Sequence, residues 1–165
     1  MKKAVWSGAV AAAVLLVSSV ASAQTLANAS VNVTANVNAK AKLTLGTAAI
    51  TFADADPDLT PSIAVLPFSI DVRARTTAGS AVTLTMLATN LTSGTDTIGI
   101  GALTWTGTGT GFAATGTSNA TTAQTVGSWS GSGSPSGTQT YALANSWTYA
   151  TGTYAATLTY TLTVP

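Results

Sequence analysis

The sequence predicts a single all-β domain, an antiparallel β-sandwich of about seven to nine strands. Several segments alternate apolar and polar side chains with a period of two, which is typical of half-buried strands. The chain has 32 Thr among 165 residues and no Glu, so β-branched residues replace common helix formers. Its 15 Gly supply turn signals between the apolar runs, and no segment after residue 23 repeats with the helical period.

Residues 1–23 have the pattern of a secretory signal peptide. Lys2 and Lys3 form a basic start, residues 4–20 form an apolar run, and residues 21–23 have the small-residue sequence Ala-Ser-Ala. A membrane anchor is the alternative, but Ser and Gly interrupt the run and the cleavage pattern follows it directly. We expect cleavage after Ala23, no membrane association afterwards, and a bacterial protein that is secreted, periplasmic or at the cell surface.

The composition excludes most catalytic chemistry. The chain has no His and no Cys, which excludes a Ser-His-Asp triad, a Cys nucleophile and an ordinary zinc site. Residues 24–165 carry four cationic side chains against five Asp, a net charge of −1, which is no footprint for a nucleic acid. We expect neither an enzyme nor a cofactor.

The first element is an alternating run over residues 29–45, with Ala, Val or Leu at the odd positions and polar residues at the even positions. One strand of this length would span about 56 Å, roughly three times the usual length. Either it bends and is shared by two sheets, or its first part lies outside the domain. We divide the mature chain into residues 24–38, an N-terminal extension or first strand, and residues 39–165, the sandwich.

Four further elements follow before residue 89. Residues 48–52 predict a short strand, and residues 54–61 predict a loop, because two Pro and three Asp disfavour a strand ladder. Residues 68–75 and 82–88 both alternate and flank a turn-like sequence at residues 77–80. We expect these two strands to form a hairpin.

The second half of the chain contains fewer clear strands. Residues 98–106 predict one or two short strands, and residues 107–140, rich in Gly, Ser and Thr, predict loops and short edge strands, one of them over residues 126–130. Residues 131–137 are the most linker-like. The next strand opens at Tyr141, and a long alternating strand covers residues 154–164.

The first and last strands predict a function by strand addition. Small inward side chains in one and large ones in the other are the complementarity of an extended segment laid into a groove of a sheet. The alternative is two ordinary core strands of one closed sandwich, since alternation alone indicates only a half-buried strand. The candidates for strand exchange are Val31, Val33, Ala35, Val37, Tyr154, Leu158, Tyr160 and Leu162.

Both ends of the mature chain resemble secreted fibre proteins. Residues 27–33, 42–45 and 50–52 look like the opening of spore-coat-U-like and related pilin-like proteins. Residues 152–165 are similar to the last strand of chaperone-usher pilin subunits, in which a Gly lies fourteenth from the end, as Gly152 does here. The chain departs from that pattern because Val164, not an aromatic residue, is next to last, and because the Cys pair common in those subunits is absent.

The resemblance implies an incomplete Ig-like, pilin-like sandwich. A periplasmic chaperone would first hold this incomplete sandwich. Its groove would then be filled by residues 24–38 of a neighbouring copy or a homologous subunit. The chain would then be a structural or adhesive subunit of a surface fibre or coat.

Three carboxylates at alternate positions, Asp54, Asp56 and Asp58, form a cluster of hard oxygen ligands that suits Ca²⁺. An EF-hand loop would end in Glu, and the chain has none. A solvated turn with Asx hydrogen bonds is the favoured interpretation, and we expect no metal site.

Aromatic side chains indicate a second class of function, a stand-alone secreted module that binds carbohydrate or another surface polymer. A flat ring offers apolar area and a polar tip to a sugar. The contact candidates are Trp129 and Tyr149, and we expect Trp129 to be exposed because its surroundings are rich in Ser and Gly. Trp105 and Trp147 lie at strand ends, where we expect packing in the core.

Overall fold

The computed structural model describes residues 28–165, which fall into two units, residues 28–35 and residues 36–165. The expected signal peptide, residues 1–23, and the start of the expected extension, residues 24–27, lie outside the described residues. Residues 28–35 are exposed and form no strand. Residues 36–165 form the nearly all-β fold that the sequence predicts.

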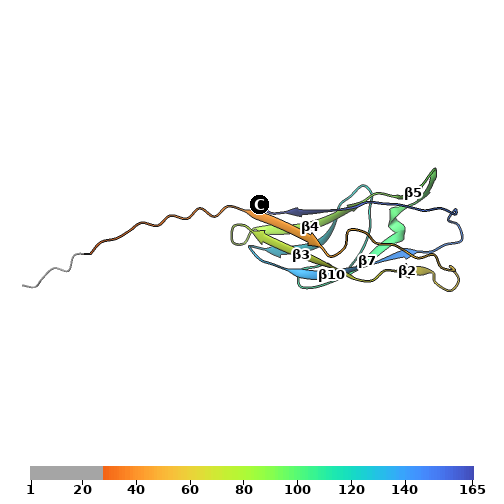
Figure 1. Cartoon of the computed structure of the whole chain (residues 1–165), viewed down its shortest axis with the longest axis horizontal. Helices are drawn as coiled ribbons and strands as arrows, with labels where there is room; N and C mark the ends of the chain where they lie inside the picture. Colours follow the sequence, from red (N-terminus) through yellow and green to blue (C-terminus); the bar gives the residue numbers. More distant parts are fainter. Residues whose placement is uncertain (1–27) are drawn as a thin grey trace, which may run out of the picture. The chain divides into compact units, whose positions relative to one another are not determined.

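Eleven strands and one 3-10 helix make up residues 36–165 (Figure 1). The seven longer strands are β1 (Lys40–Leu45), β3 (Phe68–Arg75), β4 (Ala81–Ala88), β7 (Leu103–Thr108), β9 (Gln124–Ser130), β10 (Ser136–Ala144) and β11 (Leu158–Thr163). Four strands have three residues each, β2 (Ser62–Ala64), β5 (Leu91–Ser93), β6 (Asp96–Ile98) and β8 (Thr115–Thr117), and the 3-10 helix η1 spans Ile100–Ala102. These short strands bring the number above the expected range.

The strands form two antiparallel sheets and a separate hairpin. Sheet A has the order β1-β3-β10-β7-β8, with β2 also paired to β10, and sheet B has the order β11-β4-β9. Strands β5 and β6 form the hairpin. Both sheets contribute to one core, which contains Ile70, Val72, Leu103, Trp105 and Tyr141 from sheet A and Leu84, Met86, Ala88 and Val126 from sheet B. The domain is therefore an antiparallel β-sandwich.

Strand β4 shows how the alternating pattern builds this core. Val82, Leu84, Met86 and Ala88 are buried, and the residues between them are less buried. Successive side chains of a strand point to opposite faces, so one face of β4 is continuously apolar. Complete burial of a Leu or Met side chain contributes about 1.5–3 kcal/mol. The alternation that predicts this strand is also what fixes its buried face.

Strands β3 and β4 are present as predicted, but the hairpin expected between them is wrong. β3 pairs with β1 and β10 in sheet A, whereas β4 pairs with β11 and β9 in sheet B. Residues 76–80 therefore cross from one sheet to the other. Alternation specifies the apolar face of each strand, and two such faces are also buried when they meet across a core. The pattern does not specify the pairing partner.

The alternating run at residues 29–45 forms a much shorter strand than its pattern predicts. Only residues 40–45 form β1, and residues 28–39 form no strand. The reason is the lack of a partner, because β3 ends at Arg75, opposite Lys40. The strand expected over residues 48–52 is also wrong: these residues are irregular, although Ile50 and Phe52 pack against the core.

The linker-like region contains a central strand of sheet A. β10 begins at Ser136, inside the expected linker, and pairs with β2, β3 and β7. The expectation that this strand opens at Tyr141 is therefore wrong. Gly and Ser signal a loop in a sequence, yet they also let neighbouring backbones approach closely. A Cβ atom on Gly137 would overlap the carbonyl oxygen of Thr108 in β7.

Candidate functional site

One long side of the sandwich is closed by the segment between β7 and β9. Residues 111–113 lie beside β9 in sheet B, where Ser128 N donates to Gly111 O over 2.8 Å and Ala113 N donates to Val126 O over 3.1 Å. Residues 115–117 then form β8, which pairs with β7 in sheet A. This segment joins the two sheets along that side.

The other long side is open. Strands β1 and β11 are the outer strands of sheets A and B, and they lie near each other without pairing. Within residues 28–165, β1 pairs only with β3 and β11 pairs only with β4, so each has one unpaired edge. We call β1 and β11, with their inward side chains, the β1–β11 seam. An unpaired strand edge is a template for another strand.

Inward side chains along the β1–β11 seam are only half-buried. They are Leu43, Leu45, Leu158, Tyr160 and Leu162. On the adjacent strands, Ile70 of β3 and Leu84 of β4 are fully buried, each with 0% exposure. The core is thus covered in the middle of each sheet and partly exposed along the seam.

Three of the four strand-exchange candidates near the C-terminus lie on the seam. Leu158, Tyr160 and Leu162 alternate on the inward face of β11. β11 is shorter than the strand expected over residues 154–164, and Tyr154 lies in the loop before it. Tyr154 packs against the core, and its hydroxyl donates to Ala150 O over 3.0 Å.

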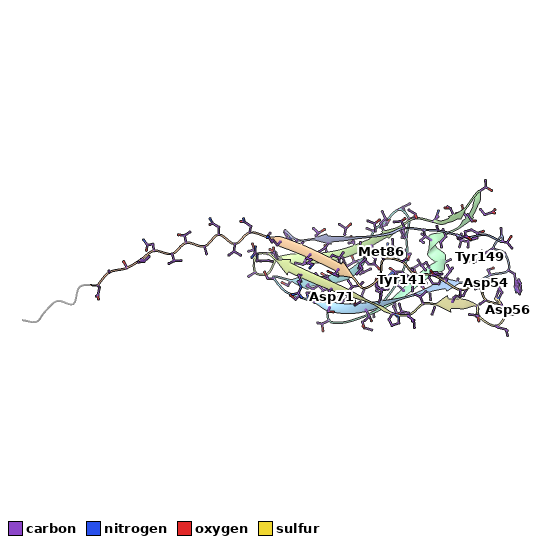
Figure 2. All side chains as sticks on the ribbon, viewed as in Figure 1. Asp54, Asp56, Asp71, Met86, Tyr141 and Tyr149 are labelled. Atoms are coloured by element: carbon purple, nitrogen blue, oxygen red, sulfur yellow. The ribbon has the colours of Figure 1, made fainter. Side chains whose placement is uncertain are left out.

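A chain of polar side chains, half-buried at Tyr160 and buried at Tyr141 and Gln139, links the seam to the centre of sheet A. The hydroxyls of Tyr160 in β11 and Tyr141 in β10 are 2.7 Å apart, and the Tyr160 hydroxyl donates to Gln139 Oε1. Because a phenol has one hydrogen to donate, Tyr141 must be the donor to Tyr160. Gln139 Nε2 is buried and has no partner among the described residues. Tyr141 lies deep between the sheets in Figure 2.

Burial alters the acidity of both phenols. Desolvation raises the pKa of Tyr160 to about 12, against the lowering effect of its hydrogen bond with Tyr141. Desolvation also raises the pKa of Tyr141, and the nearby Tyr160 raises it further. Both groups therefore stay neutral and serve as hydrogen-bond partners inside the sandwich.

The four strand-exchange candidates in residues 28–38 are all exposed. Val31, Val33 and Val37 are 86%, 88% and 67% exposed, and Ala35 is exposed as well. These alternate positions form a row of exposed apolar side chains that no other part of the described chain covers. Arg75 Nε donates to Asn38 O over 2.8 Å at the point where the chain enters β1.

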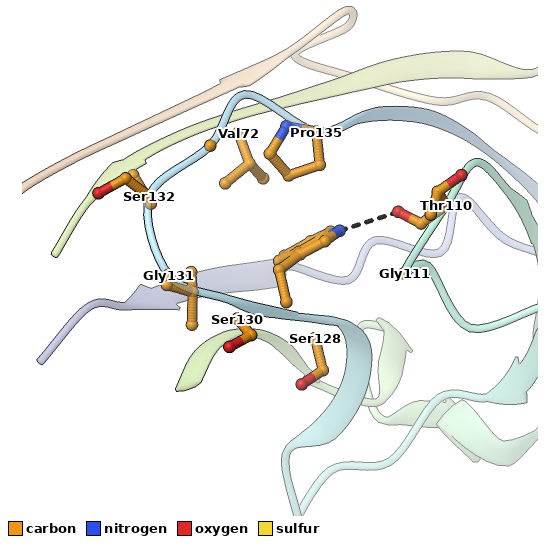
Figure 3. A pocket seen from close by; sticks show the side chains of 12 residues that line it. Val72, Thr110, Gly111, Ser128, Ser130, Gly131, Ser132 and Pro135 are labelled. Carbon is orange, nitrogen blue, oxygen red and sulfur yellow. Dashed lines mark hydrogen bonds between the residues drawn. The ribbon is translucent and has the colours of Figure 1, made fainter. Parts of the chain in front are cut away.

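Trp129 lines a hollow of about 360 Å³ at one end of the sandwich (Figure 3). Its indole Nε1 donates to Thr110 O over 2.9 Å, and Phe112 meets the ring edge-on at a centroid distance of 4.9 Å. Val72 and Pro135 lie on one side of the hollow, and no charged residue lines it. The expectation that Trp129 is exposed is wrong, because it is half-buried and fixed in orientation.

The other aromatic candidates lie elsewhere. Tyr149 is half-buried against the core in the loop after β10. Figure 2 shows it near Asp54 and far from Asp71, whose neighbour Val72 lines the Trp129 hollow. Trp105 is buried, as predicted, but Trp147 is not: it is 70% exposed, and its Nε1 donates to Asp58 Oδ1 over 3.1 Å. Trp147 and Tyr149 both lie in the loop after β10, and of the two it is Tyr149 that packs against the core.

The three alternate carboxylates form a turn. Asp56 Oδ1 accepts a hydrogen bond from Asp58 N over 2.9 Å, which confirms the expected Asx turn. Asp54, Asp56 and Asp58 are all exposed. No group of three or more acidic side chains is placed to hold a metal ion in the part of the chain that the structure describes. The calcium alternative gains no geometric support from these residues.

The structure also places four cations together. Lys40 is opposite Arg75 and Lys42 is opposite Arg73 across the β1–β3 ladder, and all four side chains are exposed. The sequence shows them as two separate pairs at alternate positions, and only the register between the strands brings them together. Gln139 and Tyr141 were likewise missed as a polar pair, because they follow a stretch that reads as a linker.

Comparisons with protein-family models, curated proteins and solved structures find no match to this chain. None of the helices among residues 28–165 has the length and apolar character needed to cross a membrane.

Proposed function

We propose that this chain is an exported structural or adhesive surface protein, a subunit of a fibre or coat that assembles by β-strand addition. The β1–β11 seam carries the proposal. Each of its strands has a free edge, and its inward side chains stay half-buried beside fully buried neighbours. An added strand would pair with the free edge of β11 and cover this apolar row.

Residues 28–37 have the properties of the added strand. Ten extended residues span about 33 Å, more than the roughly 20 Å of the six-residue strand β11. Their apolar side chains alternate and are small, which suits insertion between the larger Leu and Tyr side chains of the seam. Burying a Val in this way contributes about 1.5–3 kcal/mol, so three of them favour association strongly.

The donor is expected to come from a neighbouring copy. Residues 29–45 alternate without a break and contain no Gly or Pro. To fill its own seam, the chain would have to reverse direction immediately before β1, within residues 38–39, and a two-residue hairpin turn favours Asn-Gly, Asp-Gly or Gly-Gly. Here the sequence is Asn38-Ala39, which lacks the glycine. The absence of a turn signal before β1 favours donation between chains.

Export and protection before assembly complete the proposal. The pattern of residues 1–23 supports secretion in a bacterium, to the periplasm, the cell surface or the medium. A monomer with a partly exposed core is prone to aggregation. A periplasmic chaperone that occupies the seam until a neighbouring subunit replaces it would prevent this, and self-association or a homologous subunit would supply the final strand.

Deletion of residues 24–38 tests the proposal. The polymer of the exported chain, seen as heat-labile multimers on gels of unboiled samples, should be lost, while the remaining domain stays folded. Retention of the multimers after deletion would contradict strand addition. Boiling should dissociate the multimers completely, since the chain has no Cys for covalent links.

A peptide of residues 28–38 provides the matched test. It should bind the deleted chain and raise its melting temperature. A Val33→Lys peptide should not bind, because a charge would enter the apolar row. An Asn32→Lys peptide carries the same charge on the opposite face and should bind as the unmodified peptide does. Equal binding by both variants would show that the seam does not distinguish the apolar face of the peptide from its polar face.

The Trp129 hollow favours a second candidate, a binding module for a neutral carbohydrate of a surface polymer. Its apolar wall, its indole ring and its lack of charge are typical of a sugar subsite. Titration with neutral oligosaccharides should then change the indole fluorescence, and Ala74→Leu, which fills the hollow, should abolish the change. A binding module predicts no change in oligomeric state when residues 24–38 are deleted, which separates the two functions.

A further inference from the structure

Seven of the nine charged side chains of residues 36–165 gather toward the two ends of the sandwich. The other two are Asp71, which lies in β3 two residues before Arg73, and Asp96 in β6. Lys40, Lys42, Arg73 and Arg75 lie where β1 begins and β3 ends, together with the C-terminal Pro165, whose carbonyl oxygen accepts a hydrogen bond from Thr76 Oγ1 over 2.6 Å. We call this the basic end. These are all the Lys and Arg residues after residue 23. Figure 1 shows the C-terminus beside the start of β1 at this end.

The opposite end is acidic. The loop before β2 carries Asp54, Asp56 and Asp58, and Figure 2 shows Asp54 and Asp56 at the end of the domain away from the basic end. Backbone and side-chain bonds hold this loop against the segment after β10: Asn145 Nδ2 donates to Ala55 O over 2.9 Å and to Thr60 O over 3.1 Å. The acidic end is therefore a defined surface.

Exposed apolar side chains lie beside these carboxylates. Trp147 is 70% exposed and hydrogen-bonded to Asp58, and Leu59, the residue after Asp58, is also exposed. At the basic end, Ala74 lies between Arg73 and Arg75 in β3 and lines the apolar Trp129 hollow. One end thus combines three carboxylates with apolar surface, and the other combines four cations and one carboxylate, Asp71, with apolar surface. The net charges of the two ends are complementary to each other.

The cations are arranged unfavourably for an isolated subunit. Lys40 faces Arg75 and Lys42 faces Arg73 directly across the ladder. Like charges in directly opposed positions destabilise a sheet. Asp71, opposite Thr44 in the same ladder, is the one carboxylate of β3 near these cations. A partner that brings further carboxylates to this edge would offset the remaining repulsion, which gives the arrangement a physical reason.

We propose that copies of this chain stack end to end, with the acidic end of one copy seated on the basic end of the next. This inference rests on the proposed strand addition. It adds a second contact between neighbouring copies, beside the one made by the donated strand. Residues 36–39 enter the fold at the basic end, so a donor segment leads from that end of one copy into the seam of the next. A contact between two different surfaces of identical copies repeats along an open fibre.

The direction of the donor strand follows from this stacking. β11 runs toward the basic end, since Thr163 lies opposite Thr83 near the start of β4. A donor that enters from the acidic end of the receiving copy has residue 38 at that end and residue 28 nearer the basic end. The donor therefore runs antiparallel to β11, in the same sense as the other pairs of both sheets.

Assembly kinetics of the exported chain at two salt concentrations provide the test. Light scattering should show about tenfold slower growth at 500 mM than at 20 mM NaCl, because salt screens attraction between exposed charges. The variant Asp54→Asn, Asp56→Asn, Asp58→Asn keeps the side-chain oxygens of the turn and should slow growth at 20 mM NaCl by about tenfold. Lys40→Gln, Lys42→Gln should do the same.

Charge reversal and a matched control sharpen the result. Lys40→Glu, Lys42→Glu should abolish growth at low salt, and adding Asp54→Lys, Asp56→Lys to the same chain should restore it. Thr115→Asp, Thr117→Asp makes the same change in net charge as the Lys→Gln pair at exposed positions of β8, far from β1 in sheet A, and should leave growth unchanged. Circular dichroism establishes that each variant is folded.

The outcomes separate the two proposals. Polymers that require residues 24–38 but grow equally fast in all charge variants and at both salt concentrations would overturn end-to-end stacking and leave strand addition standing. Polymers that persist without residues 24–38 would overturn strand addition. Slowing by the Lys→Gln pair without slowing by the Asp→Asn variant would also overturn stacking, because it would assign the basic end to an external anionic polymer.

Discussion

The hydroxyl of Tyr141 in sheet A donates a hydrogen bond to that of Tyr160 in sheet B, with 2.7 Å between the oxygens. This bond crosses the core and holds the outer strand β11 to the centre of the opposite sheet. The Tyr160 hydroxyl in turn donates to Gln139 Oε1, so three polar side chains are linked inside a core whose other residues are apolar. Removing one member leaves the others buried without partners, which costs more than the bond itself contributes.

Tyr160→Phe should lower the free energy of unfolding by about 1–3 kcal/mol, because Gln139 Oε1 and the Tyr141 hydroxyl lose their partner in a buried site. Urea denaturation followed by circular dichroism measures the change. Tyr154→Phe is the control, since its bond to Ala150 O is exposed and its loss should cost less than about 1 kcal/mol. Equal costs would show that the buried chain has no special role.

Stability should fall in alkaline solution. Burial raises the pKa of Tyr160 to about 12 and also raises that of Tyr141, above the usual value of about 10 for an unfolded chain. The unfolded state therefore loses protons first, and stability present below about pH 10 decreases as the pH rises toward 12. Between about pH 6 and 9 the curve should be nearly flat, because the chain has no His or Cys.

Urea midpoints measured from pH 6 to pH 12 give this profile. Tyr160→Phe removes one of the two titrating groups, so the decrease above pH 10 should become shallower. An unchanged slope in the variant would contradict the assignment of the alkaline transition to this pair.

Two glycine substitutions should differ sharply. A Cβ on Gly116 would overlap the indole of Trp105, which is fully enclosed, so Gly116→Ala should cost about 1–3 kcal/mol. A Cβ on Gly101 would meet no atom within 4 Å, so Gly101→Ala should change stability by less than about 0.5 kcal/mol. Thermal melts of the two variants make the comparison, and a large loss in Gly101→Ala would contradict it.

Two tryptophans provide a further contrast. Trp105→Ala removes a side chain that is 3% exposed and should cost about 3–5 kcal/mol, whereas Trp147→Ala removes an exposed one and should cost less than about 0.5 kcal/mol. Denaturation curves measure both. The fluorescence of the Trp147→Ala variant should also shift to shorter wavelength, because the most exposed indole of residues 28–165 is gone. An unchanged spectrum would place Trp147 in an apolar site.

Alternation in the sequence was sufficient to predict β3, β4 and β11 and the face that each of them buries. The residues of β4 are the clearest case, since Leu84 and Met86 are buried as their period-two positions require. The pattern indicates which side chains of a strand are buried, but it does not indicate which strand pairs with which. For that reason it could not show that β3 and β4 belong to opposite sheets, nor that residues 28–39 have no partner strand.

The candidate site was predicted in part. The inward row of β11 follows from its alternation, because Leu158, Tyr160 and Leu162 share one parity. The open edge beside it depends on which strands pair, and the four-cation cluster depends on the register between β1 and β3. Small residues were the main source of error: the stretch that contains Gly137 reads as a linker, yet its glycine permits the close packing of β10 against β7.

The position of β10 within sheet A has a consequence for how the chain acquires its structure. β1 and β3 are synthesised early, but their sheet needs β10 to connect them to β7, and β10 begins only at Ser136. Sheet B needs β11, which begins only at Leu158. Contacts between such distant segments close large loops and slow folding. The core of residues 36–165 therefore stays incomplete until residues 136–163 are available, so this domain should fold after its first half has been synthesised and not alongside it.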